Sequence, residues 1–187
     1  MRSLILVLSL AILVAVEARI GETPIQFADR YGRPKDSSLT KITDNASPLV
    51  QGAIDHTYEY RGWKIRAAFF QLDSPAIRMD FQKLGGPGVS PADYELQAIA
   101  AANTPPGMSW KRIAYDNPDS SNKGLAKLAE GFIGGATGQK MWQRTDGAIL
   151  WLRSNLVVRL ELAAACEYEA QLKISKEQKA RASVPKF

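Results

Sequence analysis

Two separate stretches of this chain alternate apolar and polar residues with a period of two, and turn residues interrupt each stretch at short intervals. The first stretch runs from 55 to 83 and is interrupted at Gly62 and at 73–75; the second runs from 141 to 162 and is interrupted at 146–147 and 154–155. This pattern is typical of antiparallel strands with one buried face. It predicts two three-stranded meanders, over 55–61, 63–72 and 76–83 and then over 141–145, 148–153 and 156–162.

A segment with helix-start signals lies some distance before each meander. Thr23 is suited to an N-cap, with Pro24 at the first helical position and Gln26 placed to complete a capping box. Ser90 and Pro91 repeat the start before a run that ends at Ala102. Alanine, glutamate and lysine predict a third helix over 163–182; the same residues also alternate like a strand, but length and propensity favour a helix.

These elements predict an α+β fold of two similar halves, each a short helix on a three-stranded meander, followed by a C-terminal helix. The two helix starts, at Gly21 and Gly88, are 88 − 21 = 67 residues apart. We expect one unit over 19–87, a second over 88–164 with a long inserted loop at 104–140, and a basic helix or tail over 165–187. The polar stretch 35–53 is predicted to be a loop.

The N-terminus has the layout of a secretory signal peptide. Arg2 precedes an uncharged run from Ser3 to Val16, and small or apolar residues stand at the −3 and −1 positions of a cleavage site after Ala18. The run is shorter than the roughly 20 residues that span a bilayer. We therefore expect an exported protein that makes no stable membrane insertion after cleavage; the periplasm and the extracellular space both remain open.

The formal net charge of the 187-residue chain is +5, and most of it lies at the C-terminus. Residues 173–187 hold five lysines and arginines against Glu177, which gives 5 − 1 = +4. A basic tail on a near-neutral body does not predict nucleic-acid binding. It is compatible with a solvated helix end or with an electrostatic tether to anionic envelope components.

The residues that could carry catalysis or bind metal do not converge. His56, the single histidine, is expected on a strand surface, and the single cysteine, Cys166, is expected to be buried or to pair between chains. Glu167 and Glu169 do not face each other on a helix and are expected to be solvated. The glycine-rich segment 131–138 lacks the context of a phosphate loop, and 116–122 lacks calcium-loop spacing. We assign no catalytic, cofactor-binding or metal-binding residue.

Several motifs resemble those of small uncharacterised secreted bacterial proteins: Gly21-Glu22-Thr23-Pro24, Arg30-Tyr31-Gly32-Arg33-Pro34, Ala102-Asn103, Ser109-Trp110-Lys111 and Trp142-Gln143-Arg144-Thr145-Asp146-Gly147. The doubled helix-and-meander unit also resembles the β-lactamase-inhibitor-protein-like fold, which occurs singly in the small outer-membrane lipoprotein of the β-barrel assembly machinery. The resemblance implies a binding or scaffolding role outside the cytoplasm. The lipidated cysteine of that lipoprotein is missing here.

The sequence thus predicts a non-catalytic protein-binding or scaffolding module of the cell envelope, with an envelope protein as partner. Two alternatives stay open: a secreted hydrolase of unrecognised type, and a binder of anionic envelope polymer through the basic tail. The expected interaction surface combines aromatic residues on a sheet face with basic residues of the tail: Tyr58, Tyr60, Phe70, Trp151, Lys176, Lys179 and Arg181.

Overall fold

The computed structural model describes residues 19–39, 48–86, 88–113, 141–153 and 156–183. The predicted signal peptide lies outside the described residues. So do residues 114–140 of the predicted inserted loop, where we expect a short helix at 125–132. In chain order the elements are α1 (Pro24–Tyr31), β1 (Asp36–Leu39), β2 (Ile54–Tyr60), β3 (Trp63–Phe69), β4 (Ala76–Lys83), α2 (Asp93–Ala102), β5 (Trp110–Ile113), β6 (Met141–Arg144), β7 (Ile149–Arg153), β8 (Val157–Glu161) and α4 (Ala163–Ala182).

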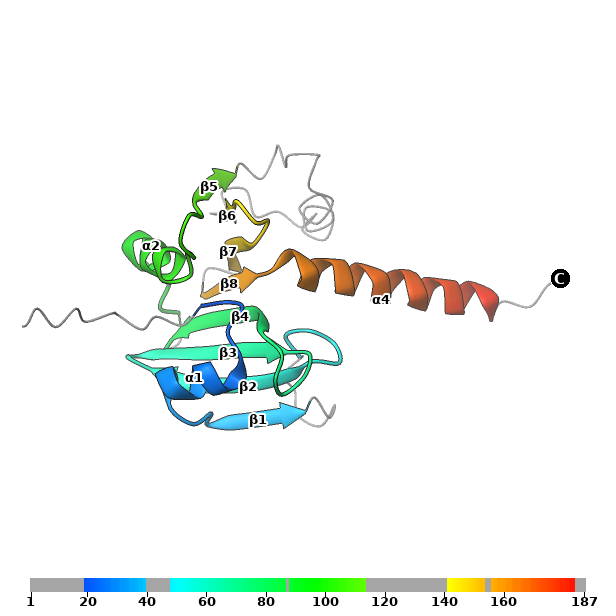
Figure 1. Ribbon diagram of the computed structural model, residues 1–187, viewed down its shortest axis with the longest axis horizontal. Helices are drawn as coiled ribbons and strands as arrows, with labels where there is room; N and C mark the ends of the chain where they lie inside the picture. Colours follow the sequence, from blue (N-terminus) through cyan, green and yellow to red (C-terminus); the bar gives the residue numbers. More distant parts are fainter. Residues whose placement is uncertain (1–18, 40–47, 87, 114–140, 154–155, 184–187) are drawn as a thin grey trace, which may run out of the picture.

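The described strands form one eight-stranded antiparallel sheet in the order β1-β2-β3-β4-β8-β7-β6-β5. Strands of the first half of the chain therefore meet those of the second half at the β4–β8 pair, where Asp80 lies opposite Arg159. The predicted α+β class is confirmed (Figure 1).

The prediction of three strands in each meander is wrong, because β1 and β5 each add one. β1 lies in the stretch predicted to be a loop, and β5 lies in the predicted inserted loop. Both strands have four residues and stand at the two ends of the strand order, where each pairs with one neighbour. Four residues are too few to show the alternation by which the longer strands are recognised.

Helices α1 and α2 pack on the same apolar core. Phe27 of α1 and Leu96 of α2 are fully buried, and both belong to the main cluster with side chains of β2, β3, β4, β7 and β8. The capping box of Thr23 and Gln26 is confirmed. Ser90 is not the N-cap of α2. The cap is Ala92, whose backbone N–H donates to the Glu95 side chain at 2.8 Å.

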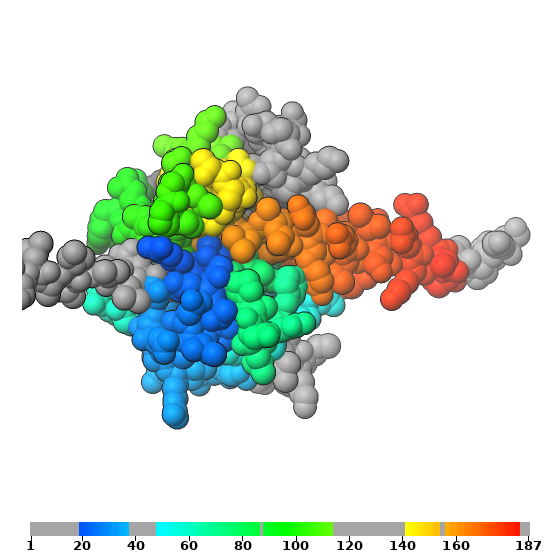
Figure 2. All heavy atoms as spheres, in the orientation of Figure 1, coloured from blue at the N-terminus to red at the C-terminus, as the bar shows by residue number. Residues whose placement is uncertain are grey.

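The opposite face of the sheet is also covered, so the prediction of one buried face is wrong. Leu49, Val50, Ala68, Ile77 and Ala165 belong to a second apolar cluster, which brings the 48–53 segment and α4 onto the sheet. A third cluster joins Met141, Ile149 and Trp151. The predicted C-terminal helix is confirmed as α4, which leaves this face and projects from the body (Figures 1 and 2).

Candidate interaction site

The predicted aromatic surface does not form, because two of its residues are in the interior. Tyr58 is 0% exposed and packs between Phe27 and Tyr31, with ring centroids 5.6 Å from each. Trp151 is 2% exposed in the third cluster. The expectation that these two side chains lie on an exposed face is wrong. The physical reason is that both faces of the sheet are covered, which a period-two pattern does not reveal.

The other two aromatic residues are half-buried and lie in different places. Tyr60 packs on Tyr31 of α1 with ring centroids 5.2 Å apart. Phe70 packs edge-on against Tyr168 of α4, with ring centroids 4.7 Å apart. Phe70 thus anchors the base of α4 to the body. The basic members of the predicted surface, Lys176, Lys179 and Arg181, are all exposed on the outer part of α4.

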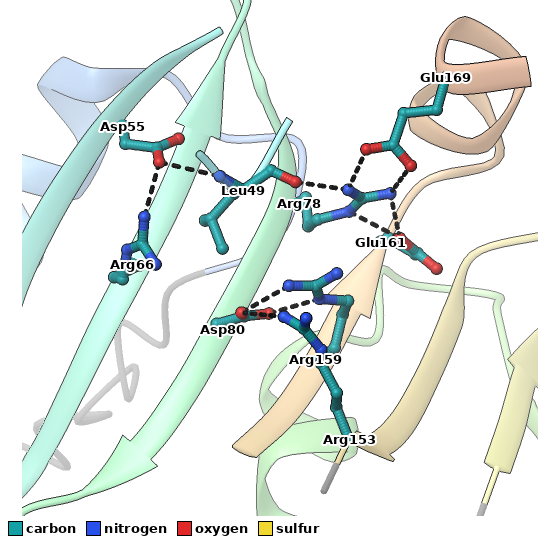
Figure 3. Close-up of polar contacts among 9 residues, drawn as sticks. All are labelled: Leu49, Asp55, Arg66, Arg78, Asp80, Arg153, Arg159, Glu161 and Glu169. Atoms are coloured by element: carbon teal, nitrogen blue, oxygen red, sulfur yellow. Dashed lines mark hydrogen bonds and ion pairs between the residues drawn. The ribbon is translucent and has the colours of Figure 1, made fainter. Parts of the chain in front are cut away.

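A buried arginine holds the base of α4. Arg78 of β4 is 2% exposed, and its guanidinium lies between Glu161 of β8 and Glu169 of α4 (Figure 3). Its Nε donates to Glu161 at 2.7 Å, and Nη1 and Nη2 donate to the two Glu169 oxygens at 2.7 and 2.9 Å. Nη1 also donates to the Leu49 carbonyl at 2.5 Å, and Nη2 lies 2.6 Å from Glu161.

These contacts engage all five N–H donors that a guanidinium possesses. Burial alone would lower the Arg78 pKa, but the two carboxylates outweigh it and raise that pKa above its usual range. The expectation that Glu169 is solvated is therefore wrong: its side chain is 42% exposed yet forms a bidentate pair with Arg78. Glu167, two residues away on the helix, is exposed as expected.

Cys166 lies beside the same cluster. Its side chain is half-buried, and burial together with the charge of Glu161 raises the pKa of the thiol to about 12. The thiol is therefore protonated at neutral pH, which makes it a poor nucleophile and a slow partner in disulfide exchange. The expected burial of Cys166 is thus met in part, and its pairing between chains stays a prediction.

A second line of ion pairs crosses the same face of the sheet. Arg159 donates to both oxygens of Asp80 at 2.7 Å, and Arg153 lies 3.9 Å from that carboxylate. Arg66 pairs with Asp55 at 2.8 Å, while the Leu49 N–H donates to Asp55 at 3.0 Å. Burial raises the Asp55 pKa, although the Leu49 N–H and Arg66 oppose that rise. Leu49 thus connects both groups of charges.

The arginines and carboxylates drawn in Figure 3 balance, four against four. The sequence analysis did not identify these ion pairs, although the sequence contains a pattern that indicates two of them. Arg78-Met79-Asp80 and Arg159-Leu160-Glu161 each carry opposite charges at an i, i+2 spacing. Antiparallel pairing of two such segments sets each arginine opposite a carboxylate, as the register between β4 and β8 does.

His56 is buried at 7% exposure, so its expected place on a strand surface is wrong. Its Nδ1 lies 3.2 Å from the Tyr58 hydroxyl, and its Nε2 has no hydrogen-bond partner within the described ranges. Burial lowers the His56 pKa, against a smaller opposing effect of Asp55. The ring packs on Phe69 at a centroid distance of 5.2 Å, as a core side chain does.

Beyond its base, α4 is exposed. Every residue from Lys173 to Ser183 is exposed, including four basic residues and Glu177, which gives this segment a net charge of 4 − 1 = +3. Lys176 Nζ of this segment donates a hydrogen bond to Gln51 Oε1 of the body at 2.6 Å. Among the described helices, none is long and apolar enough to cross a membrane. The described residues also hold no group of three potential metal ligands.

Comparison of the chain with protein-family models, with curated proteins and with solved structures gave no match.

Proposed function

We propose that this protein is a non-catalytic binding module of the cell envelope, whose folded body presents α4 to a macromolecular partner. One observation carries the proposal. The base of α4 is joined to the sheet by a fully hydrogen-bonded buried arginine, whereas every residue from 173 to 183 is exposed. The body thus holds the direction of a helix whose outer half contributes almost nothing to the core.

The cost of this arrangement supports a role for the helix. Burying an arginine and a carboxylate costs several kcal/mol of desolvation that their mutual attraction only partly returns. Replacement of a buried ion pair by apolar residues of similar volume is often neutral or stabilising, so stability alone does not require this cluster. An ion-pair cluster instead specifies one geometry, because both carboxylates must meet the planar guanidinium fork. A specified direction matters if the exposed half of α4 has a partner to meet.

The absence of catalysis belongs to the same proposal. The polar side chains of the sheet are directed at one another: Arg78, Asp80, Arg159 and Glu161 form pairs across neighbouring strands. A catalytic centre needs a nucleophile, a base and an orienting group that converge on a substrate. His56 instead packs among Tyr58 and Phe69 in the apolar core.

Export and internal duplication complete the proposal. The N-terminal pattern supports export with cleavage after Ala18. Duplication is supported by matched positions in the two helices, whose N-caps Thr23 and Ala92 are 92 − 23 = 69 residues apart. In both helices the third residue after the N-cap, Gln26 or Glu95, accepts a hydrogen bond from the N-cap backbone N–H. The fourth residue, Phe27 or Leu96, is buried. The second residue is large, apolar and exposed: Ile25 at 71% and Tyr94 at 70%.

The test is retention of the processed protein by washed cell envelopes, together with photo-cross-linking in the producing cells. We expect retention to fall when the chain is shortened after Leu172. We also expect a cross-linker at Gln178 of α4 to give an adduct with the partner, whereas a cross-linker at Gln97 of α2 should give none. Both glutamines are exposed, which makes the positions matched. Equal retention of the shortened chain would refute the proposal.

A further inference from the structure

The exposed half of α4 carries its lysines in a regular order. Lys173, Lys176 and Lys179 follow one another at a spacing of three residues, and all three are exposed. Residues three apart on a helix are neighbours on its surface, with an axial rise of about 1.5 Å per residue. The three ammonium groups therefore form a short continuous stripe. Arg181 does not continue this three-residue spacing and is not counted in the stripe.

The lysine stripe lies on a definite side of the helix. Ala165, Tyr168, Leu172, Lys176 and Lys179 are separated by three or four residues and so share one side. Ala165 and Tyr168 pack on the body from this side, and Lys176 reaches Gln51 from it at 2.6 Å. Two lysines of the stripe thus continue the side of α4 that faces the 48–53 segment.

This placement restricts the shape of a partner. A flat bilayer that approached the lysine side of α4 would meet Gln51 and Gly52, which are exposed beside it. An interfacial helix also needs an apolar face opposite its charges. The large apolar side chain that is exposed here, Ile174 at 46%, stands alone, close to the opposite side from Lys176. A protein interface of ordinary affinity would need aromatic or arginine anchors in a desolvated centre.

We infer that the stripe of Lys173, Lys176 and Lys179 binds a linear polyanion, a single flexible chain with closely spaced phosphate groups. Lysine is suited to this ligand because its ammonium group is a compact point charge that requires no fixed geometry of the phosphate. A thin polymer chain can lie along α4 beside the body, whereas a flat bilayer would be blocked there by the 48–53 segment. The inference rests on the proposed function and names the chemistry of its partner.

The experiment measures binding of the full processed chain to fluorescent inorganic polyphosphate by anisotropy, over a series of salt concentrations. The test variant is K173Q/K176Q/K179Q, which keeps helix-forming residues on α4. The matched control, R33Q/K35Q/K111Q, removes the same charge from exposed positions of the body. Circular dichroism establishes that both variants keep the helix content of the parent. Anionic phospholipid vesicles are a second probe.

We expect the α4 variant to bind polyphosphate roughly tenfold more weakly or worse at low salt, while the control stays within about twofold of the parent. Loss of three phosphate contacts should also reduce the slope of log K against log salt by about 2, as for a single-stranded nucleic acid. Equal weakening in the two variants would overturn the inference, as would binding to vesicles without binding to polyphosphate.

Failure of the inference is distinguishable from failure of the proposed function. If polyphosphate does not bind but envelope retention still requires the residues after Leu172, α4 is a binding element and the polyanion is the wrong ligand. If retention does not depend on those residues, the proposed function itself fails.

Discussion

One face of the sheet packs aromatic and aliphatic side chains beneath α1 and α2, whereas the other packs arginines against carboxylates beside the base of α4. Apolar packing is non-directional, so the first face should tolerate apolar substitutions that conserve its volume. The ion pairs require particular distances and angles. We therefore expect the helices of the apolar face to contribute mainly to stability, and the charged face to fix the direction of α4. The variants below test that distinction, from the largest expected effect to the smallest.

Removal of Arg78 should be the most damaging change on the charged face. Arg78→Met leaves Glu161, which is 0% exposed, without its counter-charge, and this should cost about 3–5 kcal/mol of unfolding free energy in urea titration. The double variant R78M/E161L removes both charges and should regain most of that loss. A single variant as stable as the parent would mean that the pair is not buried in solution.

On the apolar face the matched change is Leu96→Ala. Leu96 is 1% exposed in the main cluster, and its truncation should cost about 2–4 kcal/mol through lost transfer energy and a residual cavity. The loss should not depend on salt, because the substitution removes no charge. A loss well below 2 kcal/mol would contradict the contribution to stability that we assign to α2 on the apolar face.

His56 should make stability depend on pH. Its pKa is lowered by burial, so below the ordinary value of 6.5 the unfolded chain binds a proton that the folded chain does not. Stability should therefore fall as pH decreases from 7 to 5, by at most about 1.4 kcal/mol per pH unit. The His56→Gln variant should lose this slope. Asp55, whose raised pKa acts in the opposite direction, is present in both proteins, so the part of its contribution that is independent of His56 is common to them.

The two helix starts give the smallest effects, with opposite signs. Thr23→Ala removes a capping side chain and should cost about 0.5–1 kcal/mol. Ala92→Ser adds a hydroxyl at an extended N-cap that has no side-chain cap of its own, and should gain about 0.5 kcal/mol. Thermal unfolding of both variants measures the difference, and a shared sign would contradict the cap assignment at Ala92.

Much of the architecture was predictable from the sequence, and little of the site was. Strands β2, β3, β4, β6, β7 and β8 follow from period-two runs, and α1 from its cap and the glycine after it. The role of Arg78 was not predictable, because its partners stand 83 and 91 residues away. Tyr58 and Trp151 were misplaced for the same reason: exposure depends on which elements cover a face.

The sequence by itself determined the local structure: where the strands alternate, where α1 begins, and that residues 163–182 form a helix. These features depend on backbone propensity, capping and side-chain period, which act over a few residues. Only the tertiary structure decided that two meanders join at β4 and β8, that both faces are covered, and that α4 projects from a buried arginine. Those outcomes depend on register and on desolvation between residues far apart in the chain, and neither is encoded in any short segment.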